Sequence, residues 1–287
     1  MSRELLQAAA ARLSAAGVAS PRVDAELLLA HVLGTDRGRL VTATPATRQR
    51  EVFAELVERR AAREPLQHLL GTAAFRHLIL QVGPGVFVPR PETELLVDAV
   101  LPALRTASRP VAVDLCSGSG ALALALATEV PNSRVVAVER SESALGWLRR
   151  NADHIAVRDR LRIVAGDIAD PRLQSDLVDL SGAVDVVVCN PPYVPTATVV
   201  GPEVSHDPPD AVFAGSDGLD LVPDVIRLAA RLLKPAGVLA MEHDDTQGNS
   251  VPALLHGAGT DSAPTWTAVT DHRDLTGRAR FVTATRG

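Results

Sequence analysis

The chain has 287 residues, of which 46% are hydrophobic and 22% are charged, so a substantial core is expected and disorder is not. A net charge of −5 argues against a protein that coats nucleic acid non-specifically, because such proteins usually carry a basic stripe. Its two cysteines argue against a secreted disulfide scaffold. The sequence shows neither a signal peptide nor an apolar run of membrane-spanning length, so we expect a cytoplasmic protein.

The first 70 or so residues show helical periodicity. Helices are predicted at residues 3–16, 21–34 and 47–63, with Ser20 as the N-cap of the second and Gly34 as its stop. No catalytic constellation lies among them. We therefore expect a helical domain over residues 1–73, acting either as a partner-docking module or as a structural cap.

Residues 74–88 change to a strand pattern, which predicts a β-hairpin around Gly83-Pro84-Gly85. We interpret residues 74–90 as a hinge between two domains. A helix is expected to follow, from Leu95 to about Leu104.

From Val111 onward, strand and helix patterns alternate. Strands are predicted at residues 111–115, 135–139, 161–164, 184–189, 237–242, 265–270 and 279–285, and helices at 121–128, 141–154, 219–233 and 247–256. This alternation predicts an α/β fold with a doubly wound, mostly parallel sheet over residues 91–287.

The most distinctive stretch is the β-branched run 184–189 followed by residues 190–193 (NPPY). Neither proline has an N–H, so the strand ends here and a stiff turn begins. Asn190 and Tyr193 are therefore expected at the carboxyl end of a central strand, where open α/β sheets bind their ligands.

Residues 114–120 (DLCSGSG) comprise the end of the first strand and a glycine-rich turn at 116–120, and acids end the next two strands at Glu139 and near Asp167. Glycines let a ligand approach the backbone, and Glu139 lies near the spacing expected for a ribose-binding carboxylate. The pattern fits NAD, FAD or S-adenosylmethionine. The spacing Gly118-x-Gly120 lacks the third glycine of the dinucleotide fingerprint, which disfavours NAD and FAD.

Together these residues resemble a class I S-adenosylmethionine-dependent methyltransferase of the amino-methylating type. Residues 64–71 (EPLQHLLG), 89–94 (PRPETE) and 242–244 (EHD) extend the resemblance to the bacterial peptide chain release factor N5-glutamine methyltransferase family. The resemblance covers nearly the whole chain. It implies a seven-stranded sheet with a reversed last hairpin, and an acceptor glutamine in the Gly-Gly-Gln motif of release factors, with no membrane and no direct nucleic-acid partner.

The resemblance also implies site residues. S-adenosyl-L-methionine, which leaves as S-adenosyl-L-homocysteine, would contact Asp114, Cys116, Ser117, Gly118, Ser119, Gly120, Glu139, Asp167, Ile168 and Asn190. The acceptor would contact Asn190, Pro191, Pro192 and Tyr193, with Asn190, Pro191 and Tyr193 carrying catalysis; no metal is implied. The family usually has glycine where this chain has Cys116, and often an aromatic residue where it has Ile168.

The chemistry explains the motif. An amide nitrogen is a poor nucleophile because its lone pair is delocalised into the carbonyl. The Asn190 side-chain oxygen and the Pro191 carbonyl could each accept one amide N–H, while Tyr193 packs on the amide plane.

Alternative functions remain open from the sequence. The acceptor could be a ribosomal protein glutamine or an exocyclic amine of a nucleic acid, or the chain could be a non-catalytic binding module. An NAD oxidoreductase is disfavoured, because no residue for hydride-transfer chemistry is evident.

Overall fold

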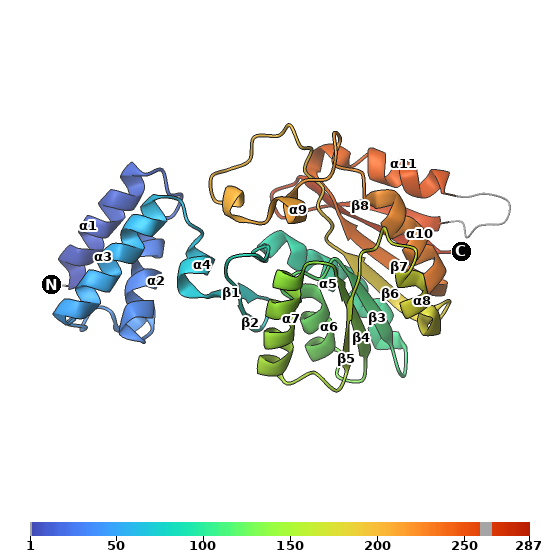
Figure 1. Cartoon of the computed structure of the whole chain (residues 1–287), viewed down its shortest axis with the longest axis horizontal. Helices are drawn as coiled ribbons and strands as arrows, with labels where there is room; N and C mark the ends of the chain where they lie inside the picture. The colour runs from blue at the N-terminus through green and yellow to red at the C-terminus, as the bar shows by residue number, and fades with distance from the viewer. Residues whose placement is uncertain (1, 259–265) are drawn as a thin grey trace. The chain divides into compact units, whose positions relative to one another are not determined.

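The computed structural model describes residues 2–258 and 266–287, and the chain divides into two compact units (Figure 1). The helical unit comprises the residues up to Ala73 together with Val82–Pro84 and Val200–Asp207. The sheet unit comprises Ala74–Gln81, Gly85–Val199 and Pro208–Gly287. Each unit has its own hydrophobic core.

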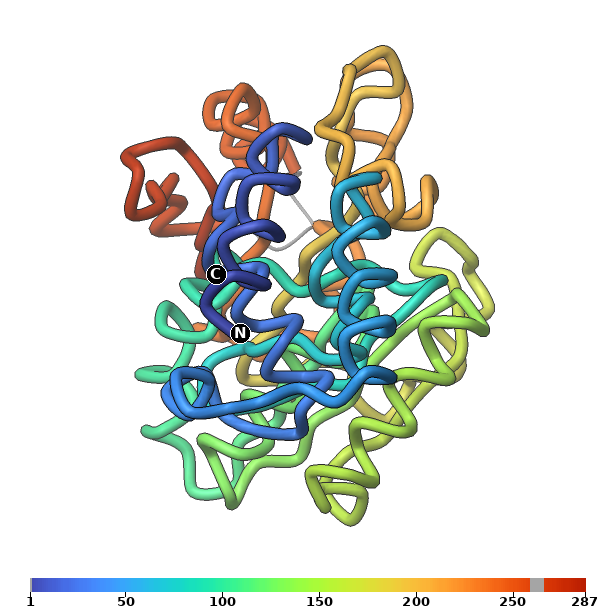
Figure 2. Tube along the Cα trace, turned by 90° about the vertical axis from the view of Figure 1, so that its left-hand side faces the viewer, coloured from blue at the N-terminus to red at the C-terminus, as the bar shows by residue number. Residues whose placement is uncertain are grey.

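The helices of the helical unit are α1 (Ser2–Ala15), α2 (Pro21–Leu33), η1 (Arg37–Arg39), α3 (Thr47–Ala61) and α4 (Leu66–Leu70), with η4 (Val204–His206) in the segment Val200–Asp207. The three longest, α1, α2 and α3, lie side by side (Figure 2). Leu13, Leu28 and Phe53 fill the core between α1, α2 and α3. The three predicted helices are confirmed, and Gly34 ends α2 in the left-handed conformation. Ser20 occupies the predicted N-cap position before Pro21, but its side chain makes no capping hydrogen bond; its backbone carbonyl accepts the Asp24 N–H at 2.9 Å.

The hairpin is present, but its predicted turn is wrong. The strands are β1 (Thr72–Phe75) and β2 (Leu78–Gln81), so the chain reverses at Arg76-His77 rather than at Gly83-Pro84-Gly85. Arg76 adopts a left-handed φ of 53° there. Its N–H donates to Glu94 Oε1 at 2.8 Å and its guanidinium binds Glu129. Tertiary contacts therefore stabilise a turn that the local sequence does not predict.

The sheet unit contains the predicted seven-stranded sheet, in the order β5-β4-β3-β6-β7-β9-β8. All neighbours pair in parallel except β9, which runs antiparallel to β7 and β8. The strands are β3 (Val111–Leu115), β4 (Arg134–Glu139), β5 (Leu161–Ala165), β6 (Val184–Cys189), β7 (Leu233–Glu242), β8 (Trp266–Arg273) and β9 (Ala279–Arg286). The strand predicted from residue 237 already begins at Leu233, and residue 265 lies outside the described residues.

Helices cover both faces of this sheet. The helices of this unit are η2 (Pro91–Thr93), α5 (Glu94–Thr106), α6 (Ala121–Glu129), α7 (Glu142–Ile155), α8 (Leu173–Asp176), η3 (Val178–Leu180), α9 (Pro209–Val212), α10 (Val222–Leu232), η5 (Asp245–Gln247) and α11 (Ser250–Gly257). Alternate residues of β6 face opposite cores: Val188 packs in the cluster with α5, α6 and α7, and Val187 in the cluster with α10 and α11. Within the described ranges, no helix has both the length and the apolar character needed to cross a bilayer.

Candidate active site

Four strand ends form one edge of the sheet. Leu115 of β3 pairs with Val138 of β4 and with Cys189 of β6, while Glu139 pairs with Ala165 of β5, so all four strands end nearly level. The chain extends the sheet from β3 through β4 and β5 on one side, then returns to β6 on the other side. This reversal of strand order next to β3 is the point at which open α/β sheets bind ligands.

The glycine-rich turn after β3 has three residues with positive φ: Cys116 at 62°, Gly118 at 56° and Gly120 at 91°. A Cβ on Gly120 would lie 2.4 Å from Leu148 Cδ1, so this glycine is needed for packing. A Cβ on Gly118 would meet no atom within 4 Å, so the backbone there faces open space. The turn therefore offers a ligand bare backbone at Gly118, and Cys116 holds a conformation that glycine adopts more easily.

The Cys116 side chain is partly exposed, whereas Cys189 is buried on the neighbouring strand. Burial and the nearby Cys116 thiol raise the pKa of Cys189 well above its usual value. Cys189 is therefore an inert thiol beneath the site.

Glu139 is an acid with fixed geometry at the end of β4. Its carboxylate accepts three backbone N–H groups, from Gly118 at 2.7 Å and from Arg140 and Ser141 at 2.8 Å each. The side chain thus ties the glycine-rich turn to β4, with 8% of the residue exposed. A carboxylate oxygen has more than one lone pair, so these bonds leave it able to accept ribose hydroxyls.

Asp114 is fully buried beneath the same turn. Its Oδ2 accepts the Ala123 N–H at 3.1 Å, and its Oδ1 has no hydrogen-bond partner among the described residues. Burial raises the pKa of Asp114 to about 7. The side chain faces the first turn of α6, so Asp114 contributes to a cofactor site by fixing the shape of the glycine-rich turn. Direct contact between Asp114 and the cofactor stays a prediction.

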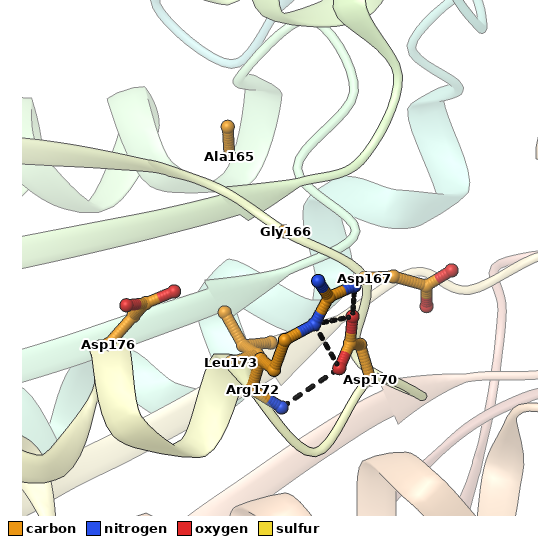
Figure 3. A pocket seen from close by; sticks show the side chains of 7 residues that line it. All are labelled: Ala165, Gly166, Asp167, Asp170, Arg172, Leu173 and Asp176. Carbon is orange, nitrogen blue, oxygen red and sulfur yellow. Dashed lines mark hydrogen bonds and ion pairs between the residues drawn. The ribbon is translucent and has the colours of Figure 1, made fainter.

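A cavity of about 300 Å³ opens beside the end of β5 (Figure 3). It is lined by Ala165, Gly166, Asp167, Asp170, Arg172, Leu173 and Asp176. Asp167 Oδ1 accepts the Ala169 N–H at 2.9 Å, and its Oδ2 lies 3.4 Å from Arg140. Ile168, next in the chain, is buried in the core shared with α10 and α11. The half-exposed carboxylate at this cavity can accept an adenine amino group.

The NPPY turn after β6 is held from several sides. Pro191 and Pro192 are buried, and the Tyr193 carbonyl accepts the Gln247 side-chain N–H at 3.0 Å. A Cβ on Gly218 would lie 2.0 Å from the Tyr193 carbonyl oxygen, so only glycine fits there. The turn is therefore a rigid platform.

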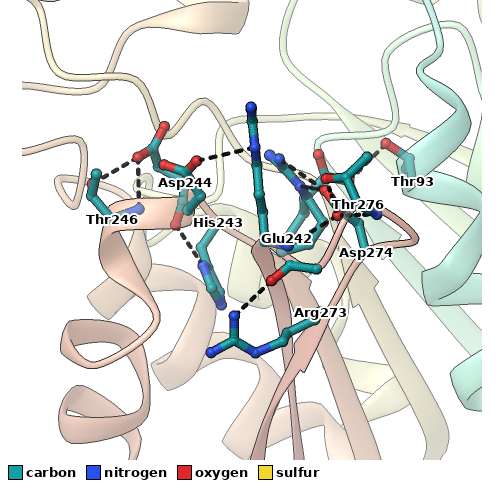
Figure 4. A network of polar contacts seen from close by, with 12 residues as sticks. Thr93, Glu242, His243, Asp244, Thr246, Arg273, Asp274 and Thr276 are labelled. Carbon is teal, nitrogen blue, oxygen red and sulfur yellow. Dashed lines mark hydrogen bonds and ion pairs between the residues drawn. The ribbon is translucent and has the colours of Figure 1, made fainter.

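One buried carboxylate joins this platform to the rest of the site. Asn190 Nδ2 donates to Thr93 Oγ1 at 3.1 Å, and Thr93 Oγ1 donates to Glu242 Oε2 at 2.7 Å. Tyr193 donates its hydroxyl to Glu242 Oε1 at 2.9 Å. Figure 4 shows Thr93 and Glu242 within the surrounding polar network. Burial raises the pKa of Glu242 to about 7, and burial together with this neighbour raises the pKa of Tyr193 well above its usual value.

The sequence reasoning missed Thr93, Glu242, Gln247 and Gly218 as site residues. Glu242 could have been found, because it is an acid at the end of a central strand, the signal that indicated Glu139. Thr93 lies 97 positions before Asn190, and no local pattern connects them.

Comparisons with known proteins identify the family. Residues 4–71 match the model of the PrmC N-terminal domain, and residues 79–207 match that of the methyltransferase small domain. A release factor glutamine methyltransferase of Mycolicibacterium smegmatis is 50% identical over 287 residues, covering 99% of this chain and 97% of that protein. A relative of the same name from Streptomyces coelicolor is also 50% identical, covering 95% of this chain and 94% of that protein.

Among solved structures, a Thermus thermophilus 16S rRNA methyltransferase (RsmC) in complex with AdoMet and guanosine matches with a TM-score of 0.54 at 20% identity. The match covers 75% of this chain and 50% of that chain, and it supports the fold alone. The sheet order, the matched methyltransferase domain and these relatives define a class I S-adenosylmethionine-dependent methyltransferase. Within that class, the identities over almost the full length place the chain in the release factor glutamine methyltransferase family.

Proposed function

We propose that this protein transfers the methyl group of S-adenosyl-L-methionine to the side-chain amide nitrogen (N5) of the glutamine in the Gly-Gly-Gln motif of peptide chain release factors, and so tunes translation termination. The names of its relatives support the acceptor. The observation that carries the chemistry is the orientation of Asn190. Because its Nδ2 donates to Thr93, its Oδ1 is the atom left for an amide N–H of the acceptor.

The residues at the strand ends fit the methyl donor. Gly118 presents open backbone, Glu139 a fixed carboxylate for ribose hydroxyls, and Asp167 a carboxylate for the adenine amino group. The bound sulfonium supplies an already activated methyl group. What remains for the protein is to hold the acceptor nitrogen in line with the S–CH3 bond.

In the transfer, the glutamine amide nitrogen attacks the methyl carbon. An N–C bond forms, the C–S bond breaks with its electron pair passing to sulfur, and one N–H proton then leaves to water. Asn190 Oδ1 and the Pro191 carbonyl accept the two N–H groups and stabilise the positive charge that develops on nitrogen. Tyr193, fixed by Glu242, packs against the amide plane.

The test is transfer of labelled methyl groups from S-adenosyl-L-methionine to a panel of acceptors, followed by mapping of the labelled residue. Release factors, ribosomal proteins and DNA should be compared. Labelling of the Gly-Gly-Gln glutamine is the expected result. Labelling of a ribosomal protein glutamine or a nucleic-acid amine instead would favour the rival acceptors, and no donor binding by calorimetry would favour a binding module.

Asn190→Ala should lower kcat by about 10²–10³-fold while donor affinity is largely kept, because a positioned polar group at the reacting centre is lost. Asn249→Ala, at an exposed asparagine, is the matched control. A near-normal kcat for Asn190→Ala would remove this residue from the reaction.

A further inference from the structure

We propose that Thr93 and Glu242 are positioning residues that determine which end of the Asn190 amide faces the acceptor. The inference rests on the proposed function, because the acceptor amide is the group that needs the Asn190 oxygen. It goes further by assigning a task to two residues far from Asn190 in the chain.

The Thr93 hydroxyl has a single proton. That proton is directed at Glu242 Oε2, at an O–O distance of 2.7 Å. Towards Asn190 the hydroxyl can therefore only accept, and the Asn190 NH2 group supplies the donor at 3.1 Å.

The opposite amide orientation is then disfavoured. A flipped Asn190 would place its Oδ1 against the oxygen of Thr93, so two acceptors would face each other with no proton between them. The NH2 group would then face the acceptor amide, where a hydrogen-bond acceptor is required. The direction of donation thus runs from Asn190 through Thr93 to Glu242.

Glu242 is well placed to impose this direction. It is fully buried, and its two oxygens accept hydrogen bonds from the hydroxyls of Thr93 and Tyr193. Thr93 is itself 4% exposed, so water does not compete easily for its proton. The Glu242 carboxylate therefore orients Tyr193 directly and Asn190 through Thr93. Asn190 and Tyr193 are the side chains that the proposed reaction places beside the acceptor.

The first experiment measures kinetics at about pH 8, above the raised pKa of the Glu242 carboxyl. Thr93→Val keeps the shape of the side chain but removes the hydroxyl. We expect kcat to fall by about 10- to 100-fold, as when supporting partners of reactive groups are removed. Calorimetric affinity for S-adenosyl-L-methionine and the melting temperature should change little. Thr93→Ser, which restores the hydroxyl, should recover most of the rate.

Thr106→Val, at an exposed threonine at the end of α5, is the control. A cycle with Asn190→Ala separates positioning from general packing. If Thr93 acts through Asn190, then Thr93→Val should lower kcat little further when it is added to Asn190→Ala. A full, independent loss in the double variant would contradict the proposal.

The second experiment needs no acceptor. The chain has four asparagines, so selective ¹⁵N labelling gives four side-chain NH2 groups to follow by NMR. Thr93→Val should shift the Asn190 signals and speed their hydrogen exchange by about fivefold. The Asn151 NH2, held by the Gln81 and Ser119 carbonyls, should stay unchanged.

The two readouts separate two kinds of failure. Absence of methyl transfer to release factors by the wild-type protein would contradict the proposed function. Unchanged Asn190 signals in Thr93→Val would contradict the positioning proposal whatever the acceptor is.

Discussion

Glu139 and Glu242 hold equivalent places in the sheet, each the last residue of a parallel strand, but different partners bind them. Glu139 accepts three backbone N–H groups, so it fixes a turn. Glu242 accepts two side-chain hydroxyls, so it fixes the orientation of side chains. Each carboxylate can therefore be tested by its own change and with its own readout.

Glu139→Gln should weaken the binding of S-adenosyl-L-methionine by about 10- to 100-fold, because a charged hydrogen bond contributes about 1.5–3 kcal/mol. The KM for the protein acceptor should change much less. Glu142→Gln, at a side chain that is 82% exposed nearby, is the control. Calorimetric titration measures the donor affinity, and an unchanged value would show that Glu139 serves the turn alone.

Glu242→Gln should change how stability depends on pH. Burial raises the pKa of Glu242 from 4.5 to about 7, against the hydrogen bonds from Thr93 and Tyr193, with Glu92 raising it and Arg280 lowering it. Because the folded pKa lies above the unfolded one, this carboxyl stabilises the fold fully below 4.5, and the contribution is lost as pH rises through about 7.

Glutamine does not ionise. The free energy of unfolding of the variant minus that of the wild type should therefore become more positive from about pH 5 to about pH 8. Urea titrations at each pH measure it, with Glu142→Gln, at an exposed side chain, measured in parallel as the control. A flat difference for Glu242→Gln would mean that the buried carboxyl titrates as it does in the unfolded chain.

At the scale of elements, the regular strands and helices and the turns after β3 and β6 were predictable, but the turn between β1 and β2 was not. The β-branched run of β6 and the glycine that ends α2 carry local signals that the fold obeys. The hairpin turn does not follow its local signal: Gly83-Pro84-Gly85 predicted the turn there, but Glu94 and Glu129 stabilise Arg76 at the reversal that forms. Asn190 was identifiable because it ends a strand, whereas Thr93 needed the tertiary contact to be seen.

The segment Val200–Asp207 shows how a connection is fixed by distant residues. It belongs to the helical unit, where Glu203 accepts from Arg63 Nε and Nη2 at 2.7 Å each and from Arg60 Nη2 at 3.0 Å. Arg60 also binds the buried Asp24 at 2.8 Å. Burial alone would raise the pKa of Glu203, but these arginines lower it below its usual value.

Glu203→Gln should therefore loosen this segment. Losing a charged hydrogen bond of about 1.5–3 kcal/mol should speed amide exchange at residues 200–207 by about 10- to 100-fold. Mass spectrometry of peptides from this segment and from α3 measures the effect. Glu58→Gln, which breaks an exposed pair with Arg12, should leave the segment unchanged. Equal exchange in Glu203→Gln and wild type would show that the ion pairs do not hold it.

At the scale of the whole molecule, the two units differ in which of the proposed contacts they contain. The cores on both faces of the sheet are made of sheet-unit residues alone, and so are the proposed donor and acceptor contacts. The helical unit has its own core and none of those contacts. We therefore expect it to contribute docking of the intact release factor rather than chemistry.

Deleting residues 1–70 tests this directly. The shortened chain should bind S-adenosyl-L-methionine with near-normal affinity and methylate a short Gly-Gly-Gln peptide at a rate close to that of the full chain. Its kcat/KM on intact release factor should fall by at least about tenfold, which corresponds to about 1.4 kcal/mol of lost binding free energy.

Because the deletion also removes Arg60 and Arg63, Glu203→Gln in the full chain is the matched control for loosening of Val200–Asp207. If that variant alone reproduced the loss, the segment and not the helices would carry the docking; full activity of the shortened chain would make the helical unit a structural cap.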